Sequence, residues 1–349
     1  MKNWIRSSTI VVLVLAILIS ISFKAAAGPT PKEDVAAFYK GKTLKFVCSK
    51  SPGGGYDAIT RLMAPFLAKY TGATVIVKNM PGAGDMLSAN YVYNKAKPDG
   101  LTIVLVAGPM VALNQVLGVS EVRYDADKFN WLARPNWDIP IFYSSAASPY
   151  RSIADLRAAK NFKVGIVGRW SLIGFRGAVT MEALGLSNAK FVAGYPGISQ
   201  ISLALVGGEV DTATASIESV VQSIKSRDSI GLATLSKTRS PLLPDVPTIY
   251  EVGMNKEGQK WLEWFLRLQK IQRVVLTGPK VPKDRVDFLR DAIMKTLENK
   301  EFLANCAKSG RSMEPMSGEE ALRLVQNVVY LNKEELKQLK YIVGKKYYK

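Results

Sequence analysis

No histidine occurs among the 349 residues of the sequence. Imidazole supplies the base in Ser-His and Cys-His nucleophile pairs, and it is a usual protein ligand of zinc. Its absence therefore excludes most hydrolases and the common zinc sites. An enzyme built from this chain would have to rely on lysine, carboxylates or a cofactor.

Cysteine is also scarce, and the two present, Cys48 and Cys306, are far apart in the sequence. Cys48 belongs to a short apolar run, residues 44–48, which is typical of a strand buried on both faces. An oxidising compartment would allow the two thiols to pair. We expect instead that both thiols are buried and unpaired.

Acidic residues are outnumbered, because 29 Asp and Glu against 47 Lys and Arg give a formal charge of +18. Lys2, Arg6 and Lys24 lie in a segment that we predict to be removed, which leaves +15. No basic and aromatic recognition motif accompanies this excess, so we expect no nucleic-acid partner. A basic surface does attract small anions.

The first 27 residues have the layout of a secretory signal peptide. Cations at the front precede an apolar core, residues 10–21, and the alanines at 25–27 form a cleavage site. The core is short for a membrane span and Lys24 interrupts it. We therefore favour cleavage before Gly28, and export of the mature chain, over a retained membrane anchor.

About 320 residues then remain, more than one hydrophobic core usually organises, so two domains are expected. Short apolar runs alternate with amphipathic stretches, which predicts an α/β fold with parallel sheets and a crevice at the carboxyl ends of the strands. The predicted strands are 44–48, 75–77 and 102–106 in one series, and 163–167, 190–192, 210–213 and 230–235 in another. We assign residues 28–135 and 241–349 to domain 1, with a mostly helical segment 247–349 packed on it, and residues 136–240 to domain 2.

A glycine-rich turn, Pro52-Gly53-Gly54-Gly55-Tyr56-Asp57, connects the first predicted strand to a helix over residues 58–69. Glycines allow a ligand to approach the backbone, and a helix start offers unpaired N–H groups to an anion. The turn lacks the Gly-Lys-Ser/Thr of a phosphate loop and the third spaced glycine of a dinucleotide site. It predicts an anionic ligand, although a tight turn without a ligand explains the glycines equally well. Arg61 is expected to pair with Asp57 one helical turn away.

Two further turns have the same character. Gly82-Ala83-Gly84 follows the second predicted strand, so it lies at the same end of the sheet as the first turn. In the second series, residues 165–171 follow a strand and end at Ser171, a good helix N-cap. Each turn could bind a ligand through its backbone or serve only to cap a helix.

These turns and several later motifs together resemble the receptors of tripartite tricarboxylate transporters, also called the Bug family. The motifs are Pro52-Gly53-Gly54-Gly55-x-Asp57-x-x-x-Arg61, Asn79-x-Pro81-Gly82-Ala83-Gly84, Lys97-Pro98-Asp99-Gly100-x-Thr102, Ser148-Pro149-Tyr150-Arg151-Ser152-Ile153-Ala154-Asp155-Leu156, Tyr195-x-Gly197, Leu205-Val206-Gly207-Gly208-Glu209-Val210-Asp211 and Leu243-Pro244-Asp245-Val246-Pro247-Thr248. They run in order from about residue 39 to residue 316. Each motif alone is weak, but the series is specific.

The resemblance implies a type II-like periplasmic binding protein fold, with two α/β lobes joined by crossing strands around a cleft. It implies a monomeric periplasmic receptor that captures a small carboxylate and delivers it to membrane permease subunits, without catalytic residues, cofactor or metal. In that family backbone N–H groups, helix ends, small hydroxyl side chains and ordered water hold the carboxylate. Carried over by position, the ligand contacts are Pro52, Gly53, Gly54, Gly55, Tyr56, Asp57, Gly82, Ala83, Gly84, Gly168, Arg169, Trp170, Ser171, Tyr195 and Gly197.

The sequence departs from the family pattern in the predicted cleft. Gly174 stands where the family usually has histidine, Arg169 and Trp170 replace small residues, and Pro196 replaces a lysine. We hypothesise that Arg169 supplies a charge to an acid group of the ligand and that Trp170 narrows the site or stacks on an aromatic solute. An exposed arginine and a packing tryptophan are the alternative.

Two other functions stay open. A receptor of this kind could present its ligand-bound form to a membrane sensor kinase. A secreted enzyme could use the same cleft with Lys50, Asp57 or Glu218 as acid or base, although the missing histidine and metal ligands argue against it.

Residues 261–266, with aromatics at helical spacing, also depart from the family pattern and are expected to be core.

Overall fold

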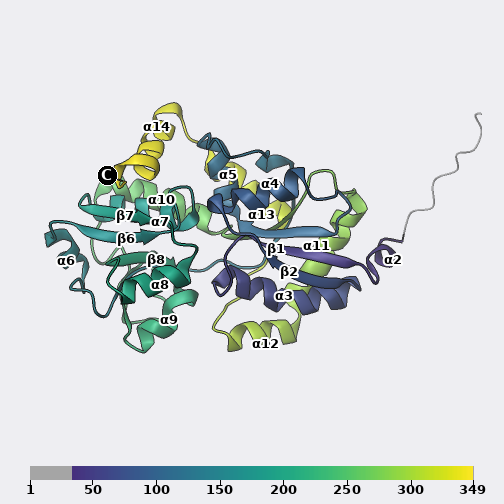
Figure 1. Ribbon diagram of the computed structural model, residues 1–349, viewed down its shortest axis with the longest axis horizontal. Helices are drawn as coiled ribbons and strands as arrows, with labels where there is room; N and C mark the ends of the chain where they lie inside the picture. The colour runs from purple at the N-terminus through teal and green to yellow at the C-terminus, as the bar shows by residue number, and fades with distance from the viewer. Residues whose placement is uncertain (1–33, 349) are drawn as a thin grey trace, which may run out of the picture. The chain divides into compact units, whose positions relative to one another are not determined.

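Two β-sheets organise the chain in the computed structural model, which describes residues 34–348 (Figure 1). The predicted signal peptide, residues 1–27, lies outside this range. Within the range, no helix has both the length and the apolar character needed to cross a membrane. A short helix, α2 (Val35–Tyr39), leads into a compact unit that comprises the chain from residue 39 onward.

The first sheet has six strands in the order β11-β4-β10-β3-β1-β2. They are β1 (Thr43–Cys48), β2 (Thr74–Asn79), β3 (Thr102–Ala107), β4 (Asn130–Arg134), β10 (Arg273–Thr277) and β11 (Met316–Ser317). β1 pairs in parallel with β2 and β3, as the alternating pattern predicted, whereas β10 is antiparallel to β3 and β4. Every residue of β3 and β10 is buried, so these central strands are covered on both faces.

Helices from both ends of the chain surround this sheet (Figure 1). They are α3 (Gly55–Thr71), α4 (Met86–Asn94), α5 (Gly108–Val116), α11 (Lys283–Glu298), α12 (Lys300–Lys308) and α13 (Gly318–Val329), with 3₁₀ turns η1 (Ala83–Asp85) and η2 (Ala126–Lys128). α11 and α12 pack on α3, and α13 packs on β4 and α5. α3 continues through Pro65 and ends at Gly72, whose φ of 71° is readily adopted only by glycine.

The second sheet has five strands in the order β7-β6-β8-β5-β9. They are β5 (Pro140–Ser145), β6 (Phe162–Ile166), β7 (Ala189–Ala193), β8 (Thr212–Ser216) and β9 (Ser229–Thr234), and their helices are α6 (Ile153–Ala158), α7 (Leu172–Leu184), α8 (Ile198–Val206) and α9 (Ile217–Lys225). β6 is parallel to β7 and β8, whereas β5 is antiparallel to β8 and β9.

The chain crosses from one sheet to the other twice. Residues 135–139 connect β4 to β5, and residues 235–272 return from β9 to β10. We call the six-stranded sheet with its surrounding helices the first lobe and the five-stranded sheet with its helices the second lobe. This is the two-lobed α/β fold that the sequence predicted. The domain boundaries at residues 136 and 240 remain our proposal.

The C-terminal segment divides between the lobes, which corrects the expectation that all of it packs on the first. α10 (Lys256–Gln269) lies along α7, and its buried Trp261, Trp264 and Phe265 confirm that this aromatic stretch is core. After α14 (Lys333–Tyr341), the π-helical turn η3 (Ile342–Lys346) also contacts α7. The backbone N–H of Phe191 on β7 donates to the Tyr347 carbonyl at 2.9 Å, which anchors this end of the chain to the second lobe.

The two cysteines are buried and free, as expected from the sequence. Cys48 lies on β1 and Cys306 on α12. Burial raises the pKa of both thiols, that of Cys306 to about 11, so neither is ionised near neutral pH.

Candidate ligand-binding pocket

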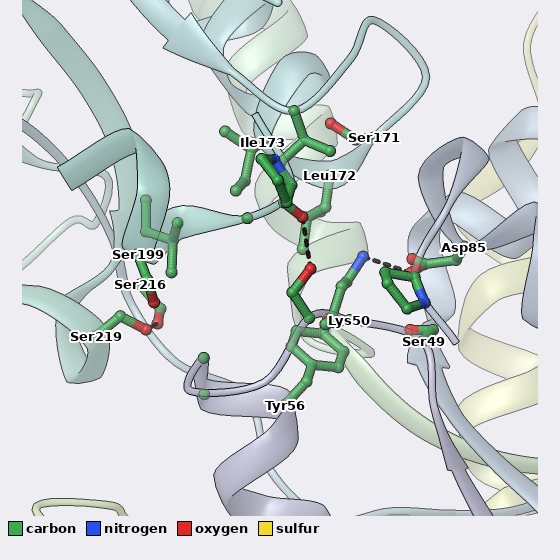
Figure 2. Close-up of a pocket in the computed structure, with 18 of the residues that line it drawn as sticks. Ser49, Lys50, Tyr56, Asp85, Ser171, Leu172, Ile173, Ser199, Ser216 and Ser219 are labelled. Atoms are coloured by element: carbon green, nitrogen blue, oxygen red, sulfur yellow. Dashed lines mark hydrogen bonds and ion pairs between the residues drawn. The ribbon is translucent and has the colours of Figure 1, made fainter. Parts of the chain in front are cut away.

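A pocket of about 100 Å³ lies where the carboxyl ends of parallel strands from both lobes meet. The first lobe contributes the turns after β1 and β2 and the start of β10, and the second lobe contributes the turns after β6 and β7 and the end of β8. Figure 2 shows Leu172 and Ile173 above the pocket and Tyr56 below it. Three serines, Ser199, Ser216 and Ser219, lie on the side opposite the Lys50–Asp85 pair (Figure 2).

The pocket brings together residues from all the turns that the sequence analysis singled out. Eight of the predicted residues line it, namely Pro52, Gly54, Gly55, Tyr56, Gly82, Gly84, Ser171 and Gly197. The others lie outside its lining, namely Gly53, Asp57, Ala83, Gly168, Arg169, Trp170 and Tyr195. Turns more than 100 residues apart in the sequence therefore line the same pocket.

Four α-helices begin at the pocket, and the N-terminal residues of each helix line it. The lining residues at these starts are Gly54, Gly55 and Tyr56 for α3, Ser171, Leu172 and Ile173 for α7, Gly197, Ile198 and Ser199 for α8, and Ser216 and Ser219 for α9. The first N–H groups of a helix have no partner within it, and the helix dipole adds positive potential there. The N-caps of α3, α8 and α9 make no side-chain cap bond. The first N–H of α9, that of Ile217, donates to the Ile139 carbonyl at 3.0 Å, so the starts of α3 and α8 leave the most N–H groups available to a ligand. Helix N-termini gathered in this way favour a negatively charged ligand.

Asp57 holds the first turn in place from outside the pocket. Its carboxylate accepts hydrogen bonds from the Gly53 N–H at 3.0 Å, the Asn79 amide at 2.8 Å and Arg61 Nε at 3.0 Å. Burial alone would raise the pKa of Asp57, but the hydrogen bonds from Arg61, Gly53 and Asn79 outweigh it and lower the pKa. The predicted Asp57–Arg61 pair is thus confirmed.

The second turn is held by an ion pair that the sequence analysis did not predict. Lys50 Nζ lies 2.5 Å from Asp85 Oδ1, and Asp85 Oδ2 accepts from the Ala107 N–H at 3.3 Å. Gly84, in this turn, has a φ of 61°, and a Cβ added there would lie only 2.2 Å from the Trp170 carbonyl oxygen. Glycine at 84 is therefore required for the two lobes to approach each other in this arrangement.

Ser171 caps α7, and its hydroxyl proton is already donated within the protein, so it cannot donate to a ligand carboxylate. Its Oγ accepts from the Gly174 N–H at 3.1 Å and donates to the Gly168 carbonyl at 2.7 Å. A Cβ at Gly174 would lie 2.1 Å from that same carbonyl oxygen, so this chain has no room for the family's usual histidine. At this end the N–H groups of Leu172 and Ile173, which also line the pocket, remain as candidate donors.

Two buried arginines reach the pocket. Arg273, at the start of β10, donates to Asn136 at 3.0 Å and lies 2.9 Å from Asp138 and 3.3 Å from Glu218. Burial alone would lower the pKa of Arg273, but these two carboxylates outweigh it and raise the pKa. The second, Arg176 on α7, is only 2% exposed. We name Arg273, Asp138 and Glu218 the hinge cluster, because Asp138 lies in the first crossing segment.

Three predicted ligand contacts have other partners in the structure. Arg169 Nη1 donates to the Gly344 carbonyl at 2.9 Å, and its guanidinium lies 4.7 Å from the centre of the Tyr348 ring. The Trp170 ring lies against Gly344, where an added Cβ would be 3.2 Å from its Cη2. Tyr195 donates to Glu209 at 2.7 Å. The hypothesis that Arg169 supplies a charge to the ligand finds no support in this geometry, because the C-terminal segment engages its side chain.

Several lining residues were missed by the sequence analysis, namely Ser49, Ser51, Asp85, Arg176, Ser199, Gln200, Ser216, Ser219, Gln272 and Arg273. One signal was present for Arg176, since it is the only cation in the mostly apolar segment Leu172–Leu184. Lys50 was considered only as a catalytic group, although it lies two residues before the first turn. Within the described residues, no group of three or more Cys, Asp or Glu side chains could hold a metal ion.

Comparison with known proteins identifies the family. The family model described as "Tripartite tricarboxylate transporter family receptor" matches residues 59–344. The chain belongs to this receptor family. It is therefore a solute-binding receptor, in agreement with the resemblance seen in the sequence.

Individual relatives agree with this assignment. The "UPF0065 protein in the TAR-I ttuE-ttuC' intergenic region" of Agrobacterium vitis is 28% identical over 226 residues, which is 62% of this chain and 63%, just under two thirds, of that relative. The structure of the periplasmic binding protein BugD is 22% identical with a TM-score of 0.70, covering 88% of this chain and 98% of that chain. MatC from Rhodopseudomonas palustris with bound malate is 21% identical with a TM-score of 0.68, covering 87% and 99%. At these identities the two structures show the fold alone.

Proposed function

We propose that this receptor captures a small carboxylate in the periplasm, as a monomer, and delivers it to the permease subunits of a tripartite tricarboxylate-type transporter. The convergence of four helix N-termini on one pocket carries this proposal. Backbone N–H groups and helix dipoles favour an anion, and a pocket of about 100 Å³ suits a small one. The family description supports the transporter, and malate bound to MatC supports the carboxylate.

The residues considered as acid or base are engaged in ion pairs, which supports a binding role over an enzymatic one. Lys50 pairs with Asp85, Asp57 with Arg61, and Glu218 with Arg273. Neither Asp57 nor Glu218 lines the pocket. A group that donates or removes a substrate proton must reach that proton within hydrogen-bond distance.

A thermal-shift panel tests the proposed ligand class. The purified receptor, unfolded and refolded to remove bound solute, is heated with acetate, succinate, malate or citrate, each compared with its neutral amide. At least one acid should raise the melting temperature, because a ligand that binds only the folded state stabilises it by mass action. The matching amide should raise it much less, since it lacks the charge that the helix N-termini favour. An amide that stabilises as well as its acid would contradict the proposal.

The transport role has a separate test in the source cell. Deletion of the gene should abolish uptake of the acid that stabilises the receptor, and plasmid-borne wild type should restore it. Uptake that is unchanged in the deletion strain, with a lost transcriptional response to the same acid, would favour the sensor role instead.

A further inference from the structure

Arg176 is a buried arginine whose charge has no partner in the described part of the chain. It is 2% exposed and lines the pocket. Among the described residues its guanidinium makes no hydrogen bond or ion pair, and its Nε is buried without an acceptor. A buried ionised group without a counter-ion is strongly unfavourable. Its presence in a pocket wall points to a counter-ion that the chain itself does not supply.

The other ionised side chains around the pocket already have partners. They are the pair Lys50–Asp85 and the hinge cluster of Arg273, Asp138 and Glu218. Asp138 attracts Arg176 and Arg273 repels it, but no carboxylate oxygen of the described residues lies within ion-pair distance of the Arg176 nitrogens. Burial lowers the pKa of Arg176, yet a guanidinium stays protonated in proteins. The Arg176 guanidinium thus has no direct ion-pair partner among the described residues.

Helix geometry places this charge beside free backbone donors. Side chains on an α-helix point toward its N-terminus and cover the residues three and four positions earlier. For Arg176 these are Leu172 and Ile173, which also line the pocket and whose N–H groups have no partner within α7. The guanidinium, two N–H groups and the dipole of α7 therefore act on the same region. Together they form a site for one oxyanion.

We propose that Arg176 forms a direct ion pair with the carboxylate of the ligand, so that this receptor recognises the full negative charge of an organic acid. The proposal rests on the proposed function and deepens it. Backbone N–H groups at helix N-termini favour an acid over its amide, but they also bind neutral carbonyl oxygens, so they discriminate less than a full positive charge does. A buried guanidinium discriminates strongly, because a neutral ligand leaves its charge unpaired. Arg176 is then the residue that determines this specificity.

Calorimetric titration with acetate, succinate, malate and citrate, and with their amides, tests the proposal on wild type and three variants. Arg176→Met should weaken binding of the acids roughly 30-fold or more and leave amide binding nearly unchanged, because one partner of a buried charge pair is removed. Arg176→Lys should lose less, since it keeps the charge but not the bidentate geometry. Arg134→Met is the matched control, because Arg134 is also 2% exposed but lies on β4 outside the pocket lining. It should leave acid affinity unchanged.

The stability of the unliganded variants gives a second readout. Arg176→Met should melt at or above the temperature of wild type, because it removes a buried unpaired charge and keeps a side chain of similar length. An Arg176→Met protein that binds the acids as wild type does would overturn the proposal. If wild type binds none of the acids, the proposed function fails. The melting temperatures of unliganded Arg176→Met and wild type then decide the role of Arg176. A lower melting temperature for the variant would show that the arginine is merely structural and would overturn the proposal.

Discussion

At the scale of single residues, the environment of Glu218 moves its titration into the neutral pH range. Burial raises its pKa to about 7, and Asp138 adds to this, while Arg273, Arg311 and the Ser312 N–H oppose it. Its ordinary value is 4.5. The folded protein therefore binds the Glu218 proton more tightly than the unfolded chain. Glu218 stabilises the fold fully below pH 4.5, and this contribution is lost as the pH rises through about 7.

Glu218→Gln should remove this pH dependence. Between pH 5 and pH 8 the free energy of unfolding of wild type should fall relative to the variant by up to roughly 3 kcal/mol, as a shift of this size implies. Urea denaturation of both proteins at one-unit pH intervals measures the difference. Parallel profiles for the two proteins would show that Glu218 is ionised in the folded state throughout this range.

At the scale of elements, the contact between α7 and α10 is close enough to override helix propensity. A Cβ added at Gly258 on α10 would lie 2.0 Å from the Glu182 carbonyl oxygen on α7. Asn255, the N-cap of α10, also donates to that carbonyl at 2.6 Å. Glycine at 258 is therefore set by the approach of two backbones and not by the needs of α10 itself.

Gly258→Ala should destabilise the receptor by about 2 kcal/mol or more, although alanine favours a helix interior over glycine by about 1 kcal/mol. A loss of stability shows that the close backbone contact dominates, whereas a gain shows that helix propensity does. Gly207→Ala is the control, because Gly207 ends α8 at an ordinary φ of −77° and its added Cβ would meet only contacts of 3.5 Å or more. It should be neutral or slightly stabilising. Chemical denaturation that finds both variants equally stable would contradict the close approach.

Local patterns were enough to predict the parallel strands of both sheets and about half of the proposed ligand contacts, whereas β4, β5 and β10 were not predicted. Apolar runs predicted β1, β2, β3 and their parallel pairing, and the glycine turns after β1 and β2 line the pocket as expected. Each of these features depends on residues close together in the sequence. The family motifs supplied the lobes, since they span most of the chain.

Contacts between distant segments account for what the sequence did not predict. Arg169 faces the carbonyl of Gly344, 175 residues later, so nothing near Arg169 indicates its direction. Arg273 reaches the pocket because β10 enters the first sheet antiparallel, between β3 and β4. Arg176 carried a local signal, the only cation in a mostly apolar helix, but its lack of a partner depends on every element that packs around it.

At the scale of the whole binding unit, a few contacts join the lobes across the pocket. Ser51 Oγ in the first lobe donates to the Pro196 carbonyl in the second at 2.8 Å. Asn114 Nδ2 donates to the Trp170 carbonyl at 3.2 Å, and Gly84 lies against that same carbonyl. Because so few hydrogen bonds join the lobes across the pocket, breaking them costs little free energy. This suits a receptor whose lobes separate to admit and release a solute.

Gly84→Ala should hinder this approach of the lobes and weaken acid binding roughly tenfold or more, because its Cβ would meet the Trp170 carbonyl oxygen at 2.2 Å. The substitution also places alanine at a φ of 61°, which alone costs about 1 kcal/mol of stability. Gly253→Ala separates the two effects, because Gly253 has a φ of 80° and nothing within 4 Å of an added Cβ. Both variants should lose similar stability in urea denaturation, whereas only Gly84→Ala should lose affinity for the acid that stabilises wild type most. Small-angle scattering with that acid should then show a larger radius of gyration for Gly84→Ala alone. Equal affinity in the two variants would mean that ligand binding does not require the lobes to meet at Gly84.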